Sequence, residues 1–300
     1  MFPVIEIPNE APEATEPVGS KPNFWFTRPQ LGKWLFKEVR QDTGEDWSEK
    51  VAAELCSLLR LPHAAYEFAR FQGRRGVMTP TFAPVGCDLV LGNELLGKVV
   101  PEYDIKRVRS PQHTLSRVLA VVRDAKLRVP LGWEAIPGVE SAFDVFIGYL
   151  MFDAWVGNQD RHHQNWGIVL SPERQPHLAP TFDHGSSLGR NEADEVRTER
   201  LATRDKGRSI QTYVQRAHSA FFRSTGRGRL TTIEAFREAA GFRPAAAQAW
   251  LTGFDAVSPQ EIRRIFESVP NELISGPAIE FAFQMLELNK GRLLGMRGTL

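Results

Sequence analysis

The chain has 300 residues, of which 42% are hydrophobic and 24% charged, and its formal net charge is +1. This length allows one large domain or two lobes, and the composition is that of an ordinary soluble globular protein. A charge near zero gives no sign of a dedicated nucleic-acid binder, so we expect no direct nucleic-acid binding. The longest apolar run is broken by Asp153 and no signal-peptide pattern opens the chain, which predicts a cytoplasmic protein that does not associate with membranes.

The first 97 residues have the pattern of a small β-rich lobe with one helix. Residues 1–18 are rich in Pro and Glu, which predicts an N-terminal arm or an edge segment. A helix is predicted from Asp46 to Pro62, with Cys56 as a small core residue, and Asp88–Leu96 connects the lobes. A turn is predicted at 73–76. Strands are predicted where apolar residues alternate with polar ones, at 24–27, 33–40, 64–71 and 77–82.

Beyond residue 98 the pattern is mainly helical. A nearly all-apolar stretch, Val139–Val156, predicts a buried central helix, and a β-hairpin follows at 166–182. Further helices are predicted at 114–125, 210–222, 232–240, 244–254, 259–269 and 277–294, with Pro in the first turn of the last three. We therefore predict an α+β protein with the bilobal layout of protein kinases. Its parts are an N-terminal arm (1–18), a β-rich, nucleotide-binding N-lobe (19–97) and a helical C-lobe (98–300).

Two polar stretches beside the 166–182 hairpin carry residues that phosphoryl transfer can use. Asp160 is followed five positions later by Asn165, and Asp183 follows Phe182 at the end of the hairpin. One carboxylate can orient an attacking hydroxyl, while an amide and a second carboxylate hold Mg²⁺ against the phosphates of ATP. Each stretch alone is also typical of a polar turn. Their order after a buried helix favours a phosphotransfer site.

The same stretches offer a competing chemistry, a metal-hydrolase centre that combines Asp160 and Asp183 with neighbouring histidines. Neither His162-His163 nor Asp183-His184 has the i, i+4 spacing that places two ligands on one face of a helix. We therefore favour phosphotransfer over metal-dependent hydrolysis.

A kinase also needs a cation on the ATP phosphates, supported by an acid on a helix. Lys37 lies on a predicted strand, and the next predicted helix carries Glu49 and Glu54. Glu49 also fits the third position of a capping box that begins at Asp46. Both glutamates border the apolar stripe of the helix, so the pattern leaves the choice between them open.

The loop that contacts the phosphates should precede Lys37, where the sequence offers Gly19, Ser20 and Lys21. One glycine followed by Pro22 is a poor match to a Walker loop or a three-glycine kinase loop, and a plain β-turn is an equal alternative. Downstream, the basic segment 190–229 is typical of a solvated surface or of an activation or substrate-docking segment.

Two motifs resemble those of the HipA-like serine/threonine kinases. Asn158–Ile168 resembles the family's N-x-D-R-H-x-x-N catalytic motif, and Leu178–Asp183 resembles its Pro-x-aromatic-Asp metal motif. The resemblance implies a bilobal kinase fold, with Asp160 as the catalytic base and Lys37 as the ATP-phosphate lysine. It further implies that Asn165 and Asp183 bind magnesium.

The resemblance also favours Glu49 over Glu54 as the ion-pair partner of Lys37. It makes the segment around Leu89, Val90 and Leu91 the hinge against which adenine lies. The complete set of residues expected at the nucleotide is Gly19, Ser20, Lys21, Lys37, Leu89, Val90, Leu91, His162, Asn165 and Asp183.

About eighteen residues precede Gly19, fewer than in long HipA-like kinases, so the chain resembles the short, HipT-type branch. We expect an ATP- and Mg²⁺-dependent serine/threonine protein kinase that acts as the toxin of a toxin–antitoxin pair. Its expected partners are a small antitoxin protein and a protein substrate, such as an aminoacyl-tRNA synthetase or another translation component. The alternatives are a lipid or small-molecule kinase and, because of the weak loop at Gly19, a nucleotide-binding pseudokinase that serves as an interaction module.

Overall fold

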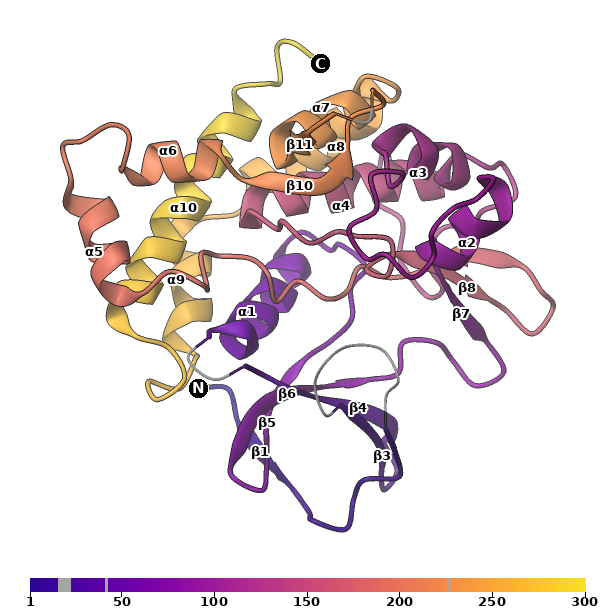
Figure 1. Cartoon of the computed structure of the whole chain (residues 1–300), viewed down its shortest axis with the longest axis horizontal. Helices are drawn as coiled ribbons and strands as arrows, with labels where there is room; N and C mark the ends of the chain where they lie inside the picture. The colour runs from indigo at the N-terminus through magenta and orange to yellow at the C-terminus, as the bar shows by residue number, and fades with distance from the viewer. Residues whose placement is uncertain (16–22, 41–42, 226) are drawn as a thin grey trace.

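The computed structural model describes residues 1–15, 23–40, 43–225 and 227–300, which form a small β-rich lobe and a larger, mainly helical lobe (Figure 1). The small lobe contains β1 (Val4–Ile7), β2 (Ala14–Thr15), β3 (Phe24–Arg28), β4 (Gly32–Glu38), α1 (Glu45–Leu58), β5 (Glu67–Phe71) and β6 (Arg74–Pro80). The rest of the chain contains β7 (Asp88–Leu91), α2 (Gly92–Val99), α3 (Leu115–Val122), α4 (Ala142–Val156), β8 (Gly167–Leu170), β9 (Pro176–Leu178), α5 (Asp194–Ala202), α6 (Ile210–Gln215), β10 (His218–Phe222), β11 (Arg229–Thr231), α7 (Thr232–Ala240), α8 (Pro244–Asp255), α9 (Pro259–Glu267) and α10 (Gly276–Leu294). The predicted α+β, two-lobed architecture is confirmed.

The small lobe is built on a six-stranded sheet with the order β1-β5-β6-β4-β3-β2. Neighbouring strands are antiparallel, except that β1 runs parallel to β5. Alternate side chains of the strands share one face, where the rings of Phe24, Phe36 and Phe71 have centroids 4.7–6.1 Å apart. β1 comes from the predicted arm, so that part of the arm forms an edge strand of this lobe.

The hairpin between β5 and β6 is tighter than predicted. Gln72 and Gly73 both have positive φ, at 52° and 75°, as a two-residue type I′ turn requires. The prediction of a turn over 73–76 was wrong, because Arg74 and Gly76 are already paired with β5.

Helix α1 joins the sheet to the larger lobe. It begins at Glu45 after Gly44, which has no side-chain cap, so the capping-box alternative for Glu49 is wrong. Asp46 instead accepts two hydrogen bonds from Arg75 of β6, at 2.9 and 2.7 Å, which attaches the helix to the sheet. Cys56 is fully buried, as predicted for a core residue.

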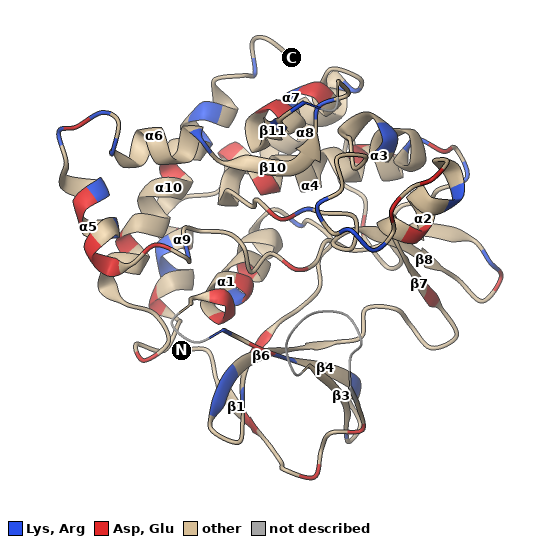
Figure 2. Cartoon of the chain, viewed as in Figure 1, with Lys and Arg blue, Asp and Glu red and all other residues tan. Residues whose placement is uncertain are grey.

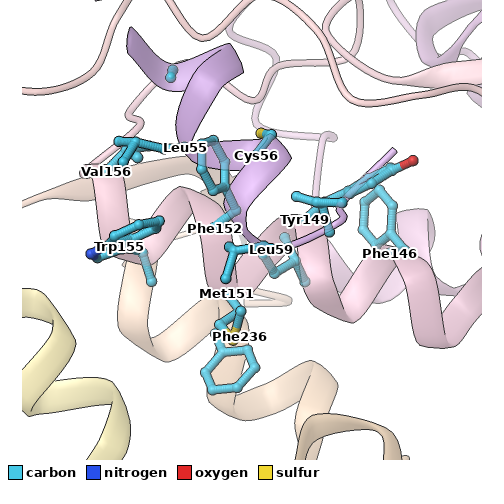
Figure 3. Close-up of a cluster of buried hydrophobic side chains, with 14 of the residues drawn as sticks. Leu55, Cys56, Leu59, Phe146, Tyr149, Met151, Phe152, Trp155, Val156 and Phe236 are labelled. Carbon is cyan, nitrogen blue, oxygen red and sulfur yellow. The ribbon is translucent and has the colours of Figure 1, made fainter. Parts of the chain in front are cut away.

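Helix α4 is the centre of the larger lobe, and all of its residues are buried. Ser141 caps its first turn, and the helix ends at Gly157, whose φ of 66° lies in the left-handed region that favours glycine. Figure 3 shows the cluster in which Phe152 and Trp155 of α4 gather with Leu55 of α1. Each large apolar side chain buried in this way contributes roughly 1.5–3 kcal/mol, so α4 firmly anchors the polar loop that starts at Gly157.

The segment 210–222, predicted as one helix, is a helix followed by a strand. α6 ends at Gln215, and β10 then pairs antiparallel with β11. Phe221 of β10 is fully buried, and buried aromatic residues favour strands. Helix α5 was not predicted, because its one buried residue is Arg197 and it has no apolar stripe. Within the described residues, no helix is both long and apolar enough to cross a membrane.

Candidate active site

Two charged residues from the two lobes meet at the candidate site. Nζ of Lys37, on β4, lies 2.9 Å from Oδ1 of Asp183, in the loop after β9, and the side chains are 24% and 39% exposed. Burial acts to raise the pKa of Asp183, but the Lys37 ammonium overcomes it and lowers that pKa to about 2. Burial acts to lower the pKa of Lys37, but the charge of Asp183 raises it. Both groups are therefore charged at neutral pH.

The backbone around Asp183 is held by two side chains of the small lobe. The carboxylate oxygens of Glu49, on α1, accept hydrogen bonds from the N–H groups of His184 at 2.7 Å and Gly185 at 2.9 Å. The N–H of Asp183 donates to the hydroxyl of Tyr66 at 3.2 Å. Asp183 itself has a φ of 59°, in the left-handed region that Asp adopts more readily than most residues. Three hydrogen bonds thus fix the peptide that carries the Asp183 carboxylate.

The expected ion pair between Lys37 and Glu49 gives way to a different arrangement. Among the described residues, the salt-bridge partner of Lys37 is Asp183, while Glu49 acts on the pKa of Lys37 through its charge. The alternative acid, Glu54, pairs with Lys50 at 2.8 Å. Glu49 is 3% exposed, and its burial raises its pKa to about 7 although the Lys37 charge opposes this. Glu49 therefore stabilises the Lys37–Asp183 pair indirectly, because its carboxylate binds the backbone N–H groups that follow Asp183.

The raised pKa of Glu49 predicts a pH-dependent contribution to stability. A carboxyl group that protonates more readily in the folded state stabilises the fold below its unfolded pKa of 4.5, and this contribution is lost as the pH rises through about 7. Relative to Glu49→Gln, the wild-type free energy of unfolding should fall by on the order of 1–3 kcal/mol from about pH 5 to about pH 8. Denaturant unfolding of both proteins at each pH measures the difference in the free energy of unfolding. The buried histidines are present in both proteins, so their opposite contribution cancels in that difference. A difference that does not change with pH would contradict it.

The loop after α4 presents Asp160 at the same site. The N–H of Asp160 donates to Oδ1 of Asn158 at 3.0 Å, and its carbonyl accepts from Nδ2 of Asn165 at 2.8 Å. The carboxylate remains 26% exposed, with Nη2 of Arg109 at 3.4 Å and Nε2 of His162 at 3.8 Å. His162 experiences the charges of both Asp160 and Asp183, so these groups lie together.

Arg161, the next residue, connects the loop that carries Asp160 to the core. Its guanidinium is fully buried and makes two hydrogen bonds to Asp153 of α4, at 2.8 and 2.6 Å. It also donates to the carbonyl of Asn165 at 2.9 Å and lies 3.3 Å from Nε2 of His184. One buried cation therefore holds α4, the Asp160 loop and the Asp183 loop in a fixed relation.

The two polar stretches contain three histidines, His162, His163 and His184, of which the last two pair with hydroxyl groups of the protein. Nδ1 of His163 lies 2.9 Å from the hydroxyl of Tyr103, and Nε2 of His184 lies 2.8 Å from that of Thr181. Burial lowers the pKa of all three, His162 included, and that of His163 to about 4. Within the described parts of the chain, no group of three or more His, Cys, Asp or Glu residues is arranged to hold a metal.

Asn165 and Asp183 offer the kind of oxygen ligands that Mg²⁺ prefers. Nδ2 of Asn165 is used by the Asp160 carbonyl, which leaves its Oδ1 for a cation. The depressed pKa of Asp183 keeps that carboxylate ionised at neutral pH. Mg²⁺ commonly combines one or two such protein oxygens with water and phosphate oxygens, so these two residues fit the predicted metal.

The predicted hinge residues lie on β7. This strand pairs with β8, which follows the loop that carries Asp160. Leu89 is exposed, and Val90 and Leu91 are half-buried. Gly167 of β8 is required there, because a Cβ at this position would lie 2.4 Å from the carbonyl oxygen of Val90. Contact of these hinge residues with adenine stays a prediction. The predicted phosphate-loop residues lie outside the described residues: Gly19, Ser20 and Lys21.

A cavity of about 400 Å³ lies apart from this site, between the start of α1 and the start of α10. None of the candidate catalytic residues lines it. Its three lining arginines are each paired with a carboxylate, Arg75 with Asp46 at 2.7 Å, Arg190 with Glu45 at 2.8 Å and Arg197 with Asp194 at 2.7 Å. These charges are thus already neutralised within the protein.

Sequence reasoning missed several contributors to the site. Asp153 breaks the apolar run of a buried helix, and Arg161 follows it eight positions later. An acid in such a helix with an arginine nearby in the sequence is a usable signal of a buried ion pair. Tyr66 and Arg109 reach the site from segments with no distinguishing pattern, and only the tertiary structure reveals them.

No family model matches the sequence, and no curated protein matches it. Solved structures do match. The chain is similar to the proinflammatory kinase CtkA of Helicobacter pylori, with a TM-score of 0.74 and 19% identity over 99% of this chain and 98% of that chain. It is also similar to a chain of the Shewanella oneidensis MR-1 toxin–antitoxin complex of HipA, HipB and operator DNA, with a TM-score of 0.59 and 13% identity over 96% of this chain and 68% of that chain. In agreement with the layout predicted from the sequence, the chain has the bilobal, kinase-like fold of these two structures.

Proposed function

We propose that the protein is an ATP- and Mg²⁺-dependent kinase of the HipA-like type that phosphorylates a serine or threonine hydroxyl of a protein. The observation that carries the proposal is the meeting of a small-lobe cation with polar residues of the larger lobe. Lys37 and Asp183 are in contact at 2.9 Å, and His162 lies within the electric fields of both Asp160 and Asp183. A phosphotransferase needs these residue types at one place.

In this proposal each residue has one task. Asp160 orients the acceptor hydroxyl and takes its proton as the oxygen forms a bond to the γ-phosphorus, while the bond from that phosphorus to the bridging oxygen breaks. Lys37 neutralises phosphate charge. Asn165 and Asp183 would hold Mg²⁺, which when bound would supply further positive charge to stabilise the transferred group. Glu49, Tyr66 and Arg161 keep these side chains in place through the bonds described above. Catalysis then arises from positioning and electrostatics.

The partners are proposed by similarity. One neighbour belongs to a toxin–antitoxin system in which HipA is found with HipB and operator DNA. We propose that this chain likewise acts as a toxin with a small antitoxin protein as partner. We further propose that its protein substrate is a translation component such as an aminoacyl-tRNA synthetase.

The experiment that tests the proposal is the transfer of labelled γ-phosphate from ATP to proteins of a cell lysate and to the kinase itself, with and without Mg²⁺. Mg²⁺-dependent labelling of serine or threonine supports the proposal. Labelling of lipids or small molecules in place of protein favours the alternative acceptor class. Nucleotide binding without any transfer indicates a pseudokinase.

A binding measurement separates the metal ligands from the chemistry. MgATP should raise the Tm of the wild type, and Asp183→Asn should lose most of this shift, because an amide binds Mg²⁺ less well than a carboxylate. Each variant is compared with its own nucleotide-free Tm, since the substitution also removes the ionic partner of Lys37. Asp124→Asn, which changes a carboxylate in the turn after α3, is the matched control and should keep the full shift. An undiminished shift in Asp183→Asn would argue against Asp183 as a magnesium ligand.

A further inference from the structure

The loop between α2 and α3 lies beside the proposed catalytic base. Nη2 of Arg109 is 3.4 Å from Oδ1 of Asp160, and the Arg109 side chain is 65% exposed. An ion pair this long and this exposed contributes little to stability, roughly 0–1 kcal/mol. Arg109 is therefore a cation at the site that is free to change its partner.

The position of this loop relative to Asp160 is fixed by contacts with α2 and with the loop that carries Asp160. The hydroxyl of Tyr103 lies 2.9 Å from Nδ1 of His163, and Nδ2 of Asn93 donates to the carbonyl of Ile105 at 3.2 Å. Oδ1 of Asp104 accepts hydrogen bonds from the next turn, from the N–H groups of residues 106 and 107 at 3.0 and 3.1 Å. The segment is thus a preformed surface next to the acceptor side of the site.

The side chains of this segment combine positive charge with apolar area. Lys106, Arg107 and Arg109 alternate with Ile105 and Val108, which are 43% and 38% exposed. Figure 2 shows the blue segments along the loop that joins α2 to α3. A nucleic-acid platform uses basic side chains interleaved with exposed aromatic ones for base stacking, whereas this segment exposes aliphatic ones. Cations with aliphatic neighbours suit a peptide that carries acidic residues.

We propose that the segment 104–109, here called the basic loop, selects protein acceptors that carry Asp or Glu close to the phosphorylated hydroxyl; this rests on the proposed function. In the free protein Arg109 pairs with Asp160. An acidic residue of the acceptor replaces Asp160 as the partner of Arg109. The carboxylate of Asp160 is thereby released to accept the proton of the acceptor hydroxyl. Recognition of the acceptor and activation of the base are then coupled through one side chain.

The test is phosphorylation of a positional peptide library around serine and threonine with labelled ATP. The wild type should prefer Asp or Glu near the acceptor by about fivefold for each contacting carboxylate. Arg109→Gln should lose this preference, and Arg109→Glu should shift it to Lys or Arg, with the KM for ATP unchanged in both. Arg60→Glu is the matched control: its side chain is 59% exposed and it too has one carboxylate partner, Glu134 at 3.7 Å. This variant should keep the wild-type preference.

The outcomes separate the inference from the proposed function. If the wild type transfers phosphate to no peptide or protein, the proposed function itself fails. If it phosphorylates peptides without an acidic preference, or if Arg109→Glu keeps the wild-type profile, the basic loop does not select the acceptor. Competition by a single-stranded oligonucleotide but not by an acidic peptide overturns the inference in favour of a nucleic-acid ligand. If Arg109→Glu and Arg60→Glu change the acceptor preference equally, the preference reflects the overall charge of the protein, and the inference is also overturned.

Discussion

Replacement of Asp160 by asparagine should lower kcat for phosphate transfer by about 10²–10⁴-fold while the KM for ATP stays nearly constant. Asparagine keeps the size of the side chain and its ability to occupy the loop, whose own hydrogen bonds run through the backbone of residue 160 and the side chains of Asn158 and Asn165. What the amide cannot do is accept the proton of the acceptor hydroxyl. The loss should therefore appear in the chemical step and spare nucleotide binding.

Single-turnover transfer of labelled phosphate at saturating MgATP measures this effect directly. Asp124→Asn is again the matched control, because Oδ1 of Asp124 accepts a hydrogen bond from a backbone N–H at 2.9 Å in a turn far from the site in sequence. It should retain the wild-type rate. Transfer by Asp160→Asn within about threefold of the wild type would show that another group, or no group, acts as the base.

The architecture followed from the sequence where local pattern and tertiary packing agree. Helix α4 is nearly all apolar and fully buried. The helices with Pro244, Pro259 and Pro277 in their first turn lie close to their predicted bounds. The prediction failed where tertiary contacts override the local pattern. The segment 210–222 contains a helical pattern, but Phe221 is buried within a strand pair. Helix α5 buries an arginine, which no search for apolar periodicity detects.

The site was predictable to the level of residue types and no further. The order of Asp160, Asn165 and Asp183 along the chain indicated one polar centre. In the structure the charges of Asp160 and Asp183 both act on His162, and Nδ2 of Asn165 donates to the carbonyl of Asp160. Glu49 and Asp183 both lie close enough to Lys37 to raise its pKa. Which of them forms the salt bridge depends on distances in the fold, which spacing along the sequence does not reveal. The same holds for His184 and Gly185, which follow Asp183 in the chain. Their backbone N–H groups bind Glu49, 135 and 136 positions away in sequence.

The second large effect should come from the buried pair of Arg161 and Asp153, whose side chains are 1% and 4% exposed. Arg161→Met leaves the Asp153 carboxylate buried without its cation, so we expect a loss of about 3–5 kcal/mol in the free energy of unfolding. Asp153→Leu combined with Arg161→Met removes both charges and should restore most of that loss, because a pair of apolar side chains packs without desolvating an ion. Denaturant unfolding of the two single variants and the double variant forms the required cycle.

Phosphate transfer should not recover together with stability in the double variant. Arg161 also donates to the carbonyl of Asn165 and lies against His184, so the Asp160 loop and the Asp183 loop lose their common anchor even when the core is well packed. A displacement of about 1 Å at the reacting atoms is enough to lower catalysis by about 10²-fold. A stable double variant with low kcat would assign the buried pair to positioning of the site. A stable double variant with the wild-type kcat would mean that the pair serves the fold alone, and that α4 positions both loops through its apolar contacts.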